Sequence, residues 1–251
     1  MITLKDQNEG FSSVYKILTN QKIYKVYNQS SFTKFHRRRL SNFKIIYNET
    51  YKLKLSPKHK IISNSIIEID ELKTDPKFSI NKLLNEEKLL KNFLAQIRKV
   101  NSIDRRIIKR NLIDEIYNYI NNNSKHQKIY QKIDKLQKYL KTYRQDIVCH
   151  GDLHLKNIYL KEKRIFFLDW DYCVISSPGY ELAMFAYLEK LNEKQINKLS
   201  IYSKISLREI SHYLPICQLL DYLYLSTISK KNDKKIRSLK IEVEKFILNN
   251  L

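Results

Sequence analysis

The spacing of hydrophobic residues changes near residue 70, and this change constrains the fold more than any other feature of the sequence. Before it, short β-branched and aromatic segments have the character of strands. Those segments are residues 11–18, 22–27, 61–62 and 66–69. Residues 33–55 have helical spacing, and Ser56-Pro57 ends that run. We therefore predict a small, mostly antiparallel β-rich lobe with one helix over residues 1–70.

After residue 70 the apolar positions recur mostly with helical spacing, which predicts a larger lobe over residues 71–251. The predicted helical segments are residues 80–100, 104–120, 126–143 and most of the chain after Gly179. A short apolar strand at 147–149 and a hairpin over 157–168 interrupt this pattern. The fold class is thus α+β with two lobes, and residues 70–79 would form a hinge between them.

The charge and composition admit few other protein classes. Lys and Arg number 47 and Asp and Glu 26, so the net charge is 47 − 26 = +21. Hydrophobic residues make up 43% of the chain, which excludes a mainly disordered protein. The lysines are spread along the sequence and accompany many Ile, Asn and Tyr residues, as codon bias in an AT-rich genome would produce. A nucleic-acid binder is therefore only a distant alternative.

Two further features bear on location. The three cysteines lack C-x-x-C spacing, which favours a reducing compartment. The N-terminus lacks the apolar segment of a signal peptide, and no apolar run approaches the roughly 20 residues that span a bilayer. We expect a cytoplasmic protein without membrane insertion; the oligomeric state is not predicted.

The segment that carries chemistry begins at His150 and has the form H-x-D-x-x-x-x-N, ending at Asn157. Asp169 follows the second strand of the predicted hairpin, so the hairpin would bring it back beside Asn157. Phosphoryl transfer from ATP needs one carboxylate for the attacking hydroxyl and hard oxygen ligands for Mg²⁺. Asp152 would supply the first, and Asn157 and Asp169 would supply the second.

These motifs resemble those of the aminoglycoside phosphotransferase and choline kinase superfamily, which has a protein-kinase-like fold. The resemblance rests on His-Gly-Asp-Leu-His-x-x-Asn-Ile from His150 and on Asp-Trp-Asp-Tyr from Asp169. With Gly-Tyr-Glu-Leu-Ala at 179–183, it is greatest to choline, ethanolamine and thiamine kinases. It implies that Asp152 is the catalytic base and that Asn157 and Asp169 bind Mg²⁺. It also implies that His150 has a structural role in the loop and that Glu181 supports the catalytic loop.

The resemblance further implies that residues 1–70 bind ATP and that residues 71–251 carry the catalytic loop and the acceptor site. Ser12 and Ser13 would cover the phosphates. Lys25 would contact the α- and β-phosphates, with Lys22 and Lys16 as alternatives. The backbone of residues 66–70, which include Glu68 and Asp70, would bind adenine. The helix glutamate that usually pairs with the lysine is missing where we expect it; either Glu49 replaces it or the lysine is held otherwise.

The sequence determines the acceptor site less closely than the catalytic loop. Asp171 would bind a second Mg²⁺ or a cationic acceptor, unless it is an exposed loop residue. Trp170 and Tyr172 would contact a quaternary ammonium group by cation–π attraction, although Trp170 would equally suit the core behind the loop. His154 would lie near the phosphates or pack within the loop, without acting as a base.

The predicted function is an ATP- and Mg-dependent kinase that acts on a small cationic alcohol, with choline or ethanolamine leading. A thiamine kinase and an aminoglycoside-type phosphotransferase remain the alternatives. A protein kinase is disfavoured because no Ala-Pro-Glu segment follows Asp169.

Overall fold

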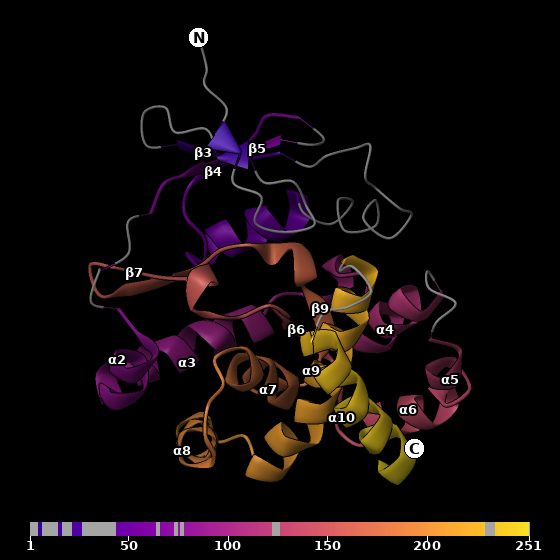
Figure 1. Ribbon diagram of the computed structural model, residues 1–251. Helices are drawn as coiled ribbons and strands as arrows, with labels where there is room; N and C mark the ends of the chain where they lie inside the picture. The colour runs from indigo at the N-terminus through magenta and orange to yellow at the C-terminus, as the bar shows by residue number, and fades with distance from the viewer. Residues whose placement is uncertain are drawn as a thin grey trace. The chain divides into compact units, whose positions relative to one another are not determined.

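The chain divides into two compact units, which we describe separately. Unit 1 comprises Met1–Val100 and Leu155–Tyr172, and unit 2 comprises Asn101–His154 and Cys173–Leu251. The computed structural model describes residues 5–6, 15–16, 22–26, 44–63, 66–72, 75, 78–121, 126–228 and 234–250 (Figure 1). All statements below concern these residues.

Unit 1 contains a three-stranded antiparallel sheet in the order β3-β5-β4. Its strands are β3 (Lys22–Val26), β4 (His59–Ile61) and β5 (Ile66–Asp70), and a separate pair is formed by β1 (Lys5–Asp6) and β2 (Tyr15–Lys16). Because side chains alternate along a strand, the register puts Lys25 on the same face as Ile67, its direct partner on β5. Lys22 and its partner Asp70 lie on the opposite face.

The rest of unit 1 is built around a hairpin of β7 (Ile158–Lys161) and β8 (Arg164–Phe167). The Phe167 amide donates to the Leu55 carbonyl over 2.7 Å, which ties β8 to the segment after the helix at 44–52. The Phe167 ring meets Phe93 edge-on at 6.1 Å, and both side chains are fully buried. Phe93 belongs to α3 (Glu87–Asn101), which follows α2 (Ile80–Asn85).

Unit 2 is mainly helical, with one short antiparallel pair of strands, β6 (Ile147–Cys149) and β9 (Val174–Ser176). Its helices are α4 (Leu112–Asn121), α5 (Gln127–Tyr130), α6 (Ile133–Leu140), α7 (Pro178–Leu188), α8 (Glu193–Ser203), α9 (Leu207–Ile228) and α10 (Lys234–Asn250). Helix α7 is buried along most of its length, which its almost wholly apolar sequence permits, and it packs against α9 (Figure 1). This central helix carries Glu181.

The α+β class, with a small sheet region and a larger helical part, is confirmed, as is the hairpin between Asn157 and Asp169. The predicted helix over 80–100 is two helices, because Glu86 adopts an extended conformation between them. The segment 126–143 likewise divides into α5 and α6. The units do not follow the predicted boundary near residue 70, because α2, most of α3 and the hairpin cluster with the N-terminal residues. The functional division at residue 70 remains a prediction.

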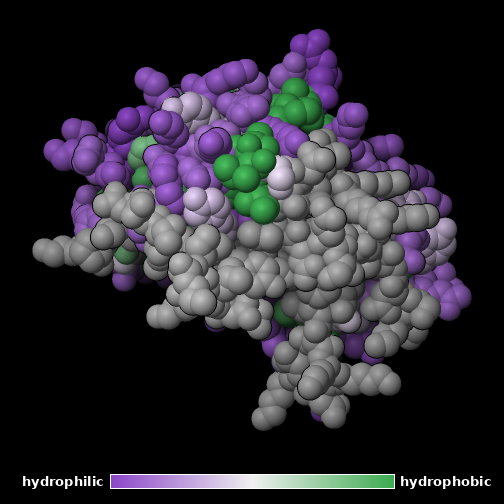
Figure 2. All heavy atoms as spheres, turned by 90° about the horizontal axis from the view of Figure 1, so that it is seen from above, coloured by the Kyte–Doolittle hydropathy of each residue, from purple (hydrophilic) through white to green (hydrophobic). Residues whose placement is uncertain are grey.

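The coloured part of the face seen in Figure 2 is mostly polar. In Figure 2 hydrophilic side chains cover most of the coloured surface, and hydrophobic residues form small patches. Among the helices that the structure describes, none has both the length and the apolar character needed to cross a bilayer.

Gly179 shows how closely α7 and α9 approach each other. Ser177 caps α7 by accepting from the Tyr180 amide, and the Gly179 amide donates to Glu209 Oε1 of α9 over 3.0 Å. A Cβ atom at position 179 would lie 2.5 Å from the Glu209 Cγ atom. Any larger residue here would therefore displace the Glu209 side chain, so the contact between the helices favours glycine.

We predict that Gly179→Ala lowers the free energy of unfolding by about 1–3 kcal/mol, because Glu209 must move and lose its hydrogen bond. Urea denaturation of the variant and the wild type measures this difference. In a Glu209→Ala background the clash is gone and alanine is the better helix former, so the same substitution should be neutral or stabilising. An equal cost in both backgrounds would contradict this explanation.

Candidate active site

One group of candidate site residues lies in unit 1, at the open end of the β7–β8 hairpin. The register pairs Ile158 with Phe167, and the Leu168 amide donates to the Asn157 carbonyl over 2.9 Å. The hairpin thus brings Asn157 close to the segment that begins at Asp169. Asp169 itself has a φ of 61°, a left-handed conformation that is uncommon for residues other than glycine. This turn separates β8 from the short helix Trp170–Tyr172.

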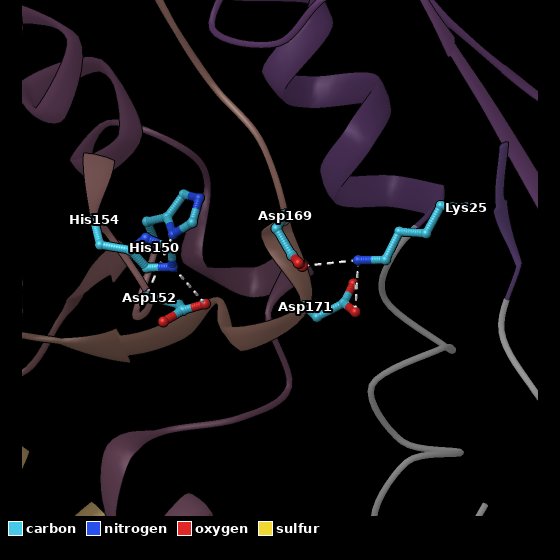
Figure 3. A network of polar contacts seen from close by, with 6 residues as sticks. All are labelled: Lys25, His150, Asp152, His154, Asp169 and Asp171. Atoms are coloured by element: carbon cyan, nitrogen blue, oxygen red, sulfur yellow. Dashed lines mark hydrogen bonds and ion pairs between the residues drawn. The ribbon is translucent and has the colours of Figure 1, made fainter. Parts of the chain in front are cut away.

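Lys25 forms two ion pairs with this segment (Figure 3). Its Nζ atom lies 2.7 Å from Asp169 Oδ1 and 2.7 Å from Asp171 Oδ2. The side chains of Lys25 and Asp171 are each only 6% exposed, whereas that of Asp169 is 34% exposed. We call these three residues the Lys25 network. Burial weakens the competition from water, so each pair is stronger than a surface ion pair.

The structure distinguishes Lys25 from the two alternative lysines. Lys22 forms its ion pairs with Glu68 and Asp70, on the face of the sheet opposite Lys25. Glu68 also accepts a hydrogen bond from the Tyr24 hydroxyl over 2.7 Å, and this bond, aided by burial, raises the pKa of Tyr24. The carboxylates of Glu68 and Asp70 therefore lie on the face of the sheet opposite Lys25. The backbone of β5, the middle strand, pairs with both neighbouring strands, so the predicted adenine contact through this backbone has no support in the structure. The structure describes only the backbone of Lys16.

The question of the missing helix glutamate has a structural answer. Glu49 lies on the helix at 44–52 and forms a surface ion pair with Lys52 at 2.6 Å. Lys25 is instead held by Asp169 and Asp171. Asp171 is only 8% exposed, so it is not the exposed loop residue that the sequence left open.

The oxygen atoms of this group suit Mg²⁺ in their chemistry. Two carboxylates already accommodate one cation, the Lys25 ammonium, and Asn157 ends the short helix Leu155–Asn157 directly before β7, where its carbonyl accepts from the Leu168 amide. Mg²⁺ is typically bound by one or two carboxylates together with substrate phosphates and water. Among the described residues no group of three or more His, Cys, Asp or Glu side chains could hold a metal ion by itself. A Mg²⁺ site that substrate phosphates complete fits both the oxygen donors present and the lack of a complete ligand cluster among the described residues.

Another group of candidate site residues lies in unit 2, where β6 leads into the loop from His150. Gly151 has a φ of 78°, so this turn favours glycine. The Asp152 amide donates to Nδ1 of His150 over 3.3 Å, which makes that nitrogen an acceptor and puts the proton of a neutral ring on Nε2. His150 is fully buried, as befits the structural role that the resemblance implies. The side chain of Asp152 is 28% exposed and accessible.

Glu181 of α7 supports this loop through a hydrogen bond to its backbone. Its Oε2 accepts a hydrogen bond from the His150 amide, and the residue is only 1% exposed. Burial raises the pKa of Glu181 to about 7, although the amides of His150 and Gly151 oppose the shift by stabilising the carboxylate. The neighbouring Cys149 thiol donates to the Ser177 carbonyl, and burial raises its pKa well above the ordinary value.

Two contacts were missed by sequence reasoning. His154 Nε2 lies 3.8 Å from Asp152 Oδ2, although we expected His154 only near phosphates or within the loop (Figure 3). The i, i+2 spacing of the two residues was the only signal. Arg110 pairs with the buried Glu115 at 3.2 Å and donates to the Cys173 carbonyl over 2.7 Å, directly after the Asp-Trp-Asp-Tyr motif. No local pattern joins residues 63 positions apart.

The aromatic residues proposed for the acceptor are placed unequally. Trp170 is 2% exposed and its ring lies 6.2 Å from that of Phe167, which favours packing over acceptor binding. Tyr172 is half-buried. In unit 2, Tyr180 and Tyr213 are buried and meet edge-on at 5.9 Å, so they too belong to the core. Ser12 and Ser13, expected at the phosphates, lie outside the described residues.

Known proteins with similar sequences and folds bear on this site. Residues 104–200 match the model of the phosphotransferase enzyme family, a range that includes both halves of the motif. The Protein LicA homolog of Metamycoplasma hominis is 26% identical over 140 residues, or 53% of this chain and 49% of that relative. The chain therefore spans about half the length of the curated relative that it matches.

Two solved structures share the fold. Choline kinase LicA from Streptococcus pneumoniae has a TM-score of 0.75 at 15% identity, over 97% of this chain and 92% of its own. The ADP-bound aminoglycoside phosphotransferase APH(2'')-Ib has a TM-score of 0.62 at 15% identity, over 98% and 92%. These likenesses confirm the kinase-like fold, and the family match over residues 104–200 bears out the predicted resemblance to this superfamily of phosphotransferases.

The pKa of Glu181 predicts a pH-dependent stability. An unfolded glutamate ionises near pH 4.5 and Glu181 near 7, so the folded chain binds the proton more tightly. The resulting stabilisation is fully present below pH 4.5 and is lost as the pH rises through 7, by about 3 kcal/mol in all. Glu181→Gln cannot titrate, so between pH 5 and 8 it should gain about 2–3 kcal/mol relative to the wild type in chemical denaturation.

Glu193→Gln, at an exposed position of α8, is the matched control and should leave the pH profile of the wild type unchanged. If the profiles of Glu181→Gln and the wild type run parallel, Glu181 is ionised throughout and the predicted shift is absent.

Proposed function

We propose that this chain is an ATP- and Mg-dependent kinase of the aminoglycoside phosphotransferase and choline kinase superfamily that phosphorylates a small cationic alcohol, choline or ethanolamine before others. The observation that carries the proposal is the Lys25 network, in which a buried ammonium is held by two carboxylates directly after the hairpin that begins at Asn157. A buried lysine with this pairing is unusual outside functional sites.

The nucleotide half of the reaction would use unit 1. Lys25 would bind phosphate oxygens of ATP as a point charge, while Asp169 and Asn157 supply oxygen ligands for Mg²⁺. Mg²⁺, when bound, would neutralise charge on the β- and γ-phosphates. Asp171 holds Lys25 in the described structure, so its first role would be to orient that lysine.

The acceptor half would use the loop of unit 2. The carboxylate of Asp152 would orient the alcohol and accept its proton, while the alcohol oxygen forms a bond to the γ-phosphorus and the bond to the leaving ADP oxygen breaks. Glu181 and Gly151 would fix the backbone of this loop, and His154 at 3.8 Å would limit the positions available to Asp152. Positioning is the main contribution that such a reaction requires of a protein.

The choice of acceptor is supported by the relatives and by charge. One solved structure of high similarity is a choline kinase, and the matched relative from Metamycoplasma hominis is a LicA homologue. The carboxylates in the motifs favour a cationic substrate over an anionic one. An aminoglycoside, also cationic, is the alternative supported by the likeness to APH(2'')-Ib, and thiamine remains a third acceptor. The cytoplasmic location stays a prediction, and a nucleic-acid binder, motivated by the net charge of +21, stays a distant alternative.

The test is ATP consumption with Mg²⁺ and choline, ethanolamine, thiamine or kanamycin as acceptor. We predict turnover with choline or ethanolamine, and a 10²–10⁴-fold lower kcat for Asp152→Asn, because the general base is lost. Lys25→Met should lower kcat/KM for ATP about 10- to 100-fold, since charge-assisted bonds to phosphate are removed.

Lys22→Met is the matched control, because Lys22 lies on the same strand with its side chain on the opposite face. It should retain activity close to that of the wild type. Full activity of Asp152→Asn would refute the role of Asp152 as general base. Turnover of kanamycin alone would show that the acceptor is an aminoglycoside and not choline or ethanolamine.

Asp171→Asn separates the two roles proposed for that residue. Because its described partner is Lys25, we predict that the substitution raises KM for ATP at least as much as KM for choline. Initial rates over a grid of both substrate concentrations give the two constants. A rise confined to the KM for choline would assign Asp171 to the acceptor instead.

A further inference from the structure

A second concave site lies in unit 1, away from the Lys25 network. It is a cavity of about 730 Å³, within the range of small-molecule sites. Four separate segments meet there: the start of β3, the segment after the helix at 44–52, the residues after β5, and the turn of the β7–β8 hairpin. The described lining residues are Lys22, Tyr51, Lys52, Lys54, Ser56, Pro57, Lys58, Asp70, Glu71, Leu72, Lys161, Glu162, Arg164 and Phe166. We call it the basic pocket.

The charge of the basic pocket is positive. Six of its lining residues are Lys or Arg and three are Asp or Glu, so the net charge is 6 − 3 = +3. Lys22 is neutralised by Asp70, and Lys52 pairs with Glu49. Across the described part of the chain no carboxylate lies within ion-pair distance of the four other cations, which are Lys54, Lys58, Lys161 and Arg164.

These four cations come from positions far apart in the sequence, so their convergence is a property of the fold. Lys54 has a φ of 58°, and the turn at Glu162 and Lys163 has φ values of 50° and 64°. These turns end the helix at 44–52 and close the hairpin, and they place exposed basic side chains around one cavity. Like charges so arranged repel one another unless an anion lies among them.

The pocket also has apolar surface. Tyr51 is 46% exposed, and the Arg164 guanidinium lies 5.3 Å above the ring of the half-buried Phe166. Pro57 and Leu72 complete the apolar part of the lining. A ligand with an organic portion as well as negative charge would therefore match the site better than a simple inorganic ion.

The basic pocket is separate from the candidate nucleotide site. It contains none of Lys25, Asn157, Asp169 or Asp171. The residue of β3 that lines it, Lys22, lies on the opposite face of the sheet from Lys25. A ligand in the basic pocket would thus be an addition to the ATP of the proposed function.

We propose that the basic pocket binds a phosphorylated small metabolite with two or more negative charges. Phosphate groups would be recognised by Lys54, Lys58, Lys161 and Arg164, and the organic portion would contact Tyr51 and Phe166. The concavity and volume favour a small molecule over a nucleic acid, which would need a charged surface that extends beyond one cavity.

The experiment is isothermal titration calorimetry of the full chain with inorganic pyrophosphate, without ATP or Mg²⁺. We expect the wild type to bind, and the double variant Lys54→Gln/Lys161→Gln to bind at least tenfold more weakly. The matched control, Lys135→Gln/Lys194→Gln, removes two exposed lysines of α6 and α8 and should bind like the wild type. A thermal melt of each variant checks that it folds.

Lys25→Met decides which site the probe occupies. Unchanged pyrophosphate affinity in this variant supports the basic pocket, whereas its loss, with full affinity in Lys54→Gln/Lys161→Gln, overturns the proposal. Equal weakening in the pocket and control variants would show binding to overall charge and would also overturn it. The proposal would also be overturned if a single-stranded RNA bound more tightly than pyrophosphate and its binding depended on Lys54 and Lys161. Because the readout is binding, its outcome is independent of whether the chain phosphorylates choline.

Discussion

The candidate nucleotide site depends on the two ion pairs of the buried Lys25 ammonium. Burial of a charge costs several kcal/mol unless partners replace the lost water, and here Asp169 and Asp171 do so at 2.7 Å each. To place them, β3 must keep its register with β5, the β7–β8 hairpin must form, and Asp169 must take a left-handed conformation. The apolar core between Phe93 and Phe167 fixes the hairpin, so packing and electrostatics support the same geometry.

The loop from His150 depends on a different interaction, a hydrogen bond to a carboxylate that is buried in the helical core of unit 2. Glu181 sits on α7, the helix with the most continuous burial in unit 2, and reaches the amide of His150. A glutamate at this depth is tolerated because backbone amides offset part of its desolvation. The remaining cost appears as a raised pKa, which makes the loop support sensitive to pH near neutrality.

Local patterns predicted much of this structure. The hairpin and the α+β class followed from alternation and spacing, whereas the ion pairs of Lys25 with Asp169 and Asp171 were not predicted. The sequence could not choose between Lys25 and Lys22, because that choice depends on which face of β3 meets the Asp169 segment. It also left open whether Trp170 packs or binds, since the same indole suits both, and burial at 2% exposure favours packing. The contact of His154 with Asp152 and the convergence of four cations in the basic pocket arise from turns and tertiary contacts, which periodicity does not encode.

Charge balance explains why Mg²⁺ and ATP would suit the Lys25 network better together than separately. One ammonium and two carboxylates carry a net charge of −1, so ATP alone would bring its phosphates towards two carboxylates. Mg²⁺ alone would meet a site already partly neutralised by Lys25, whose side chain is 6% exposed and has no water to replace its partners. With Mg·ATP, the phosphates offer Lys25 new anionic partners while the carboxylates gain the divalent ion. Each charged group then exchanges one opposite charge for another, and none is left buried without a partner.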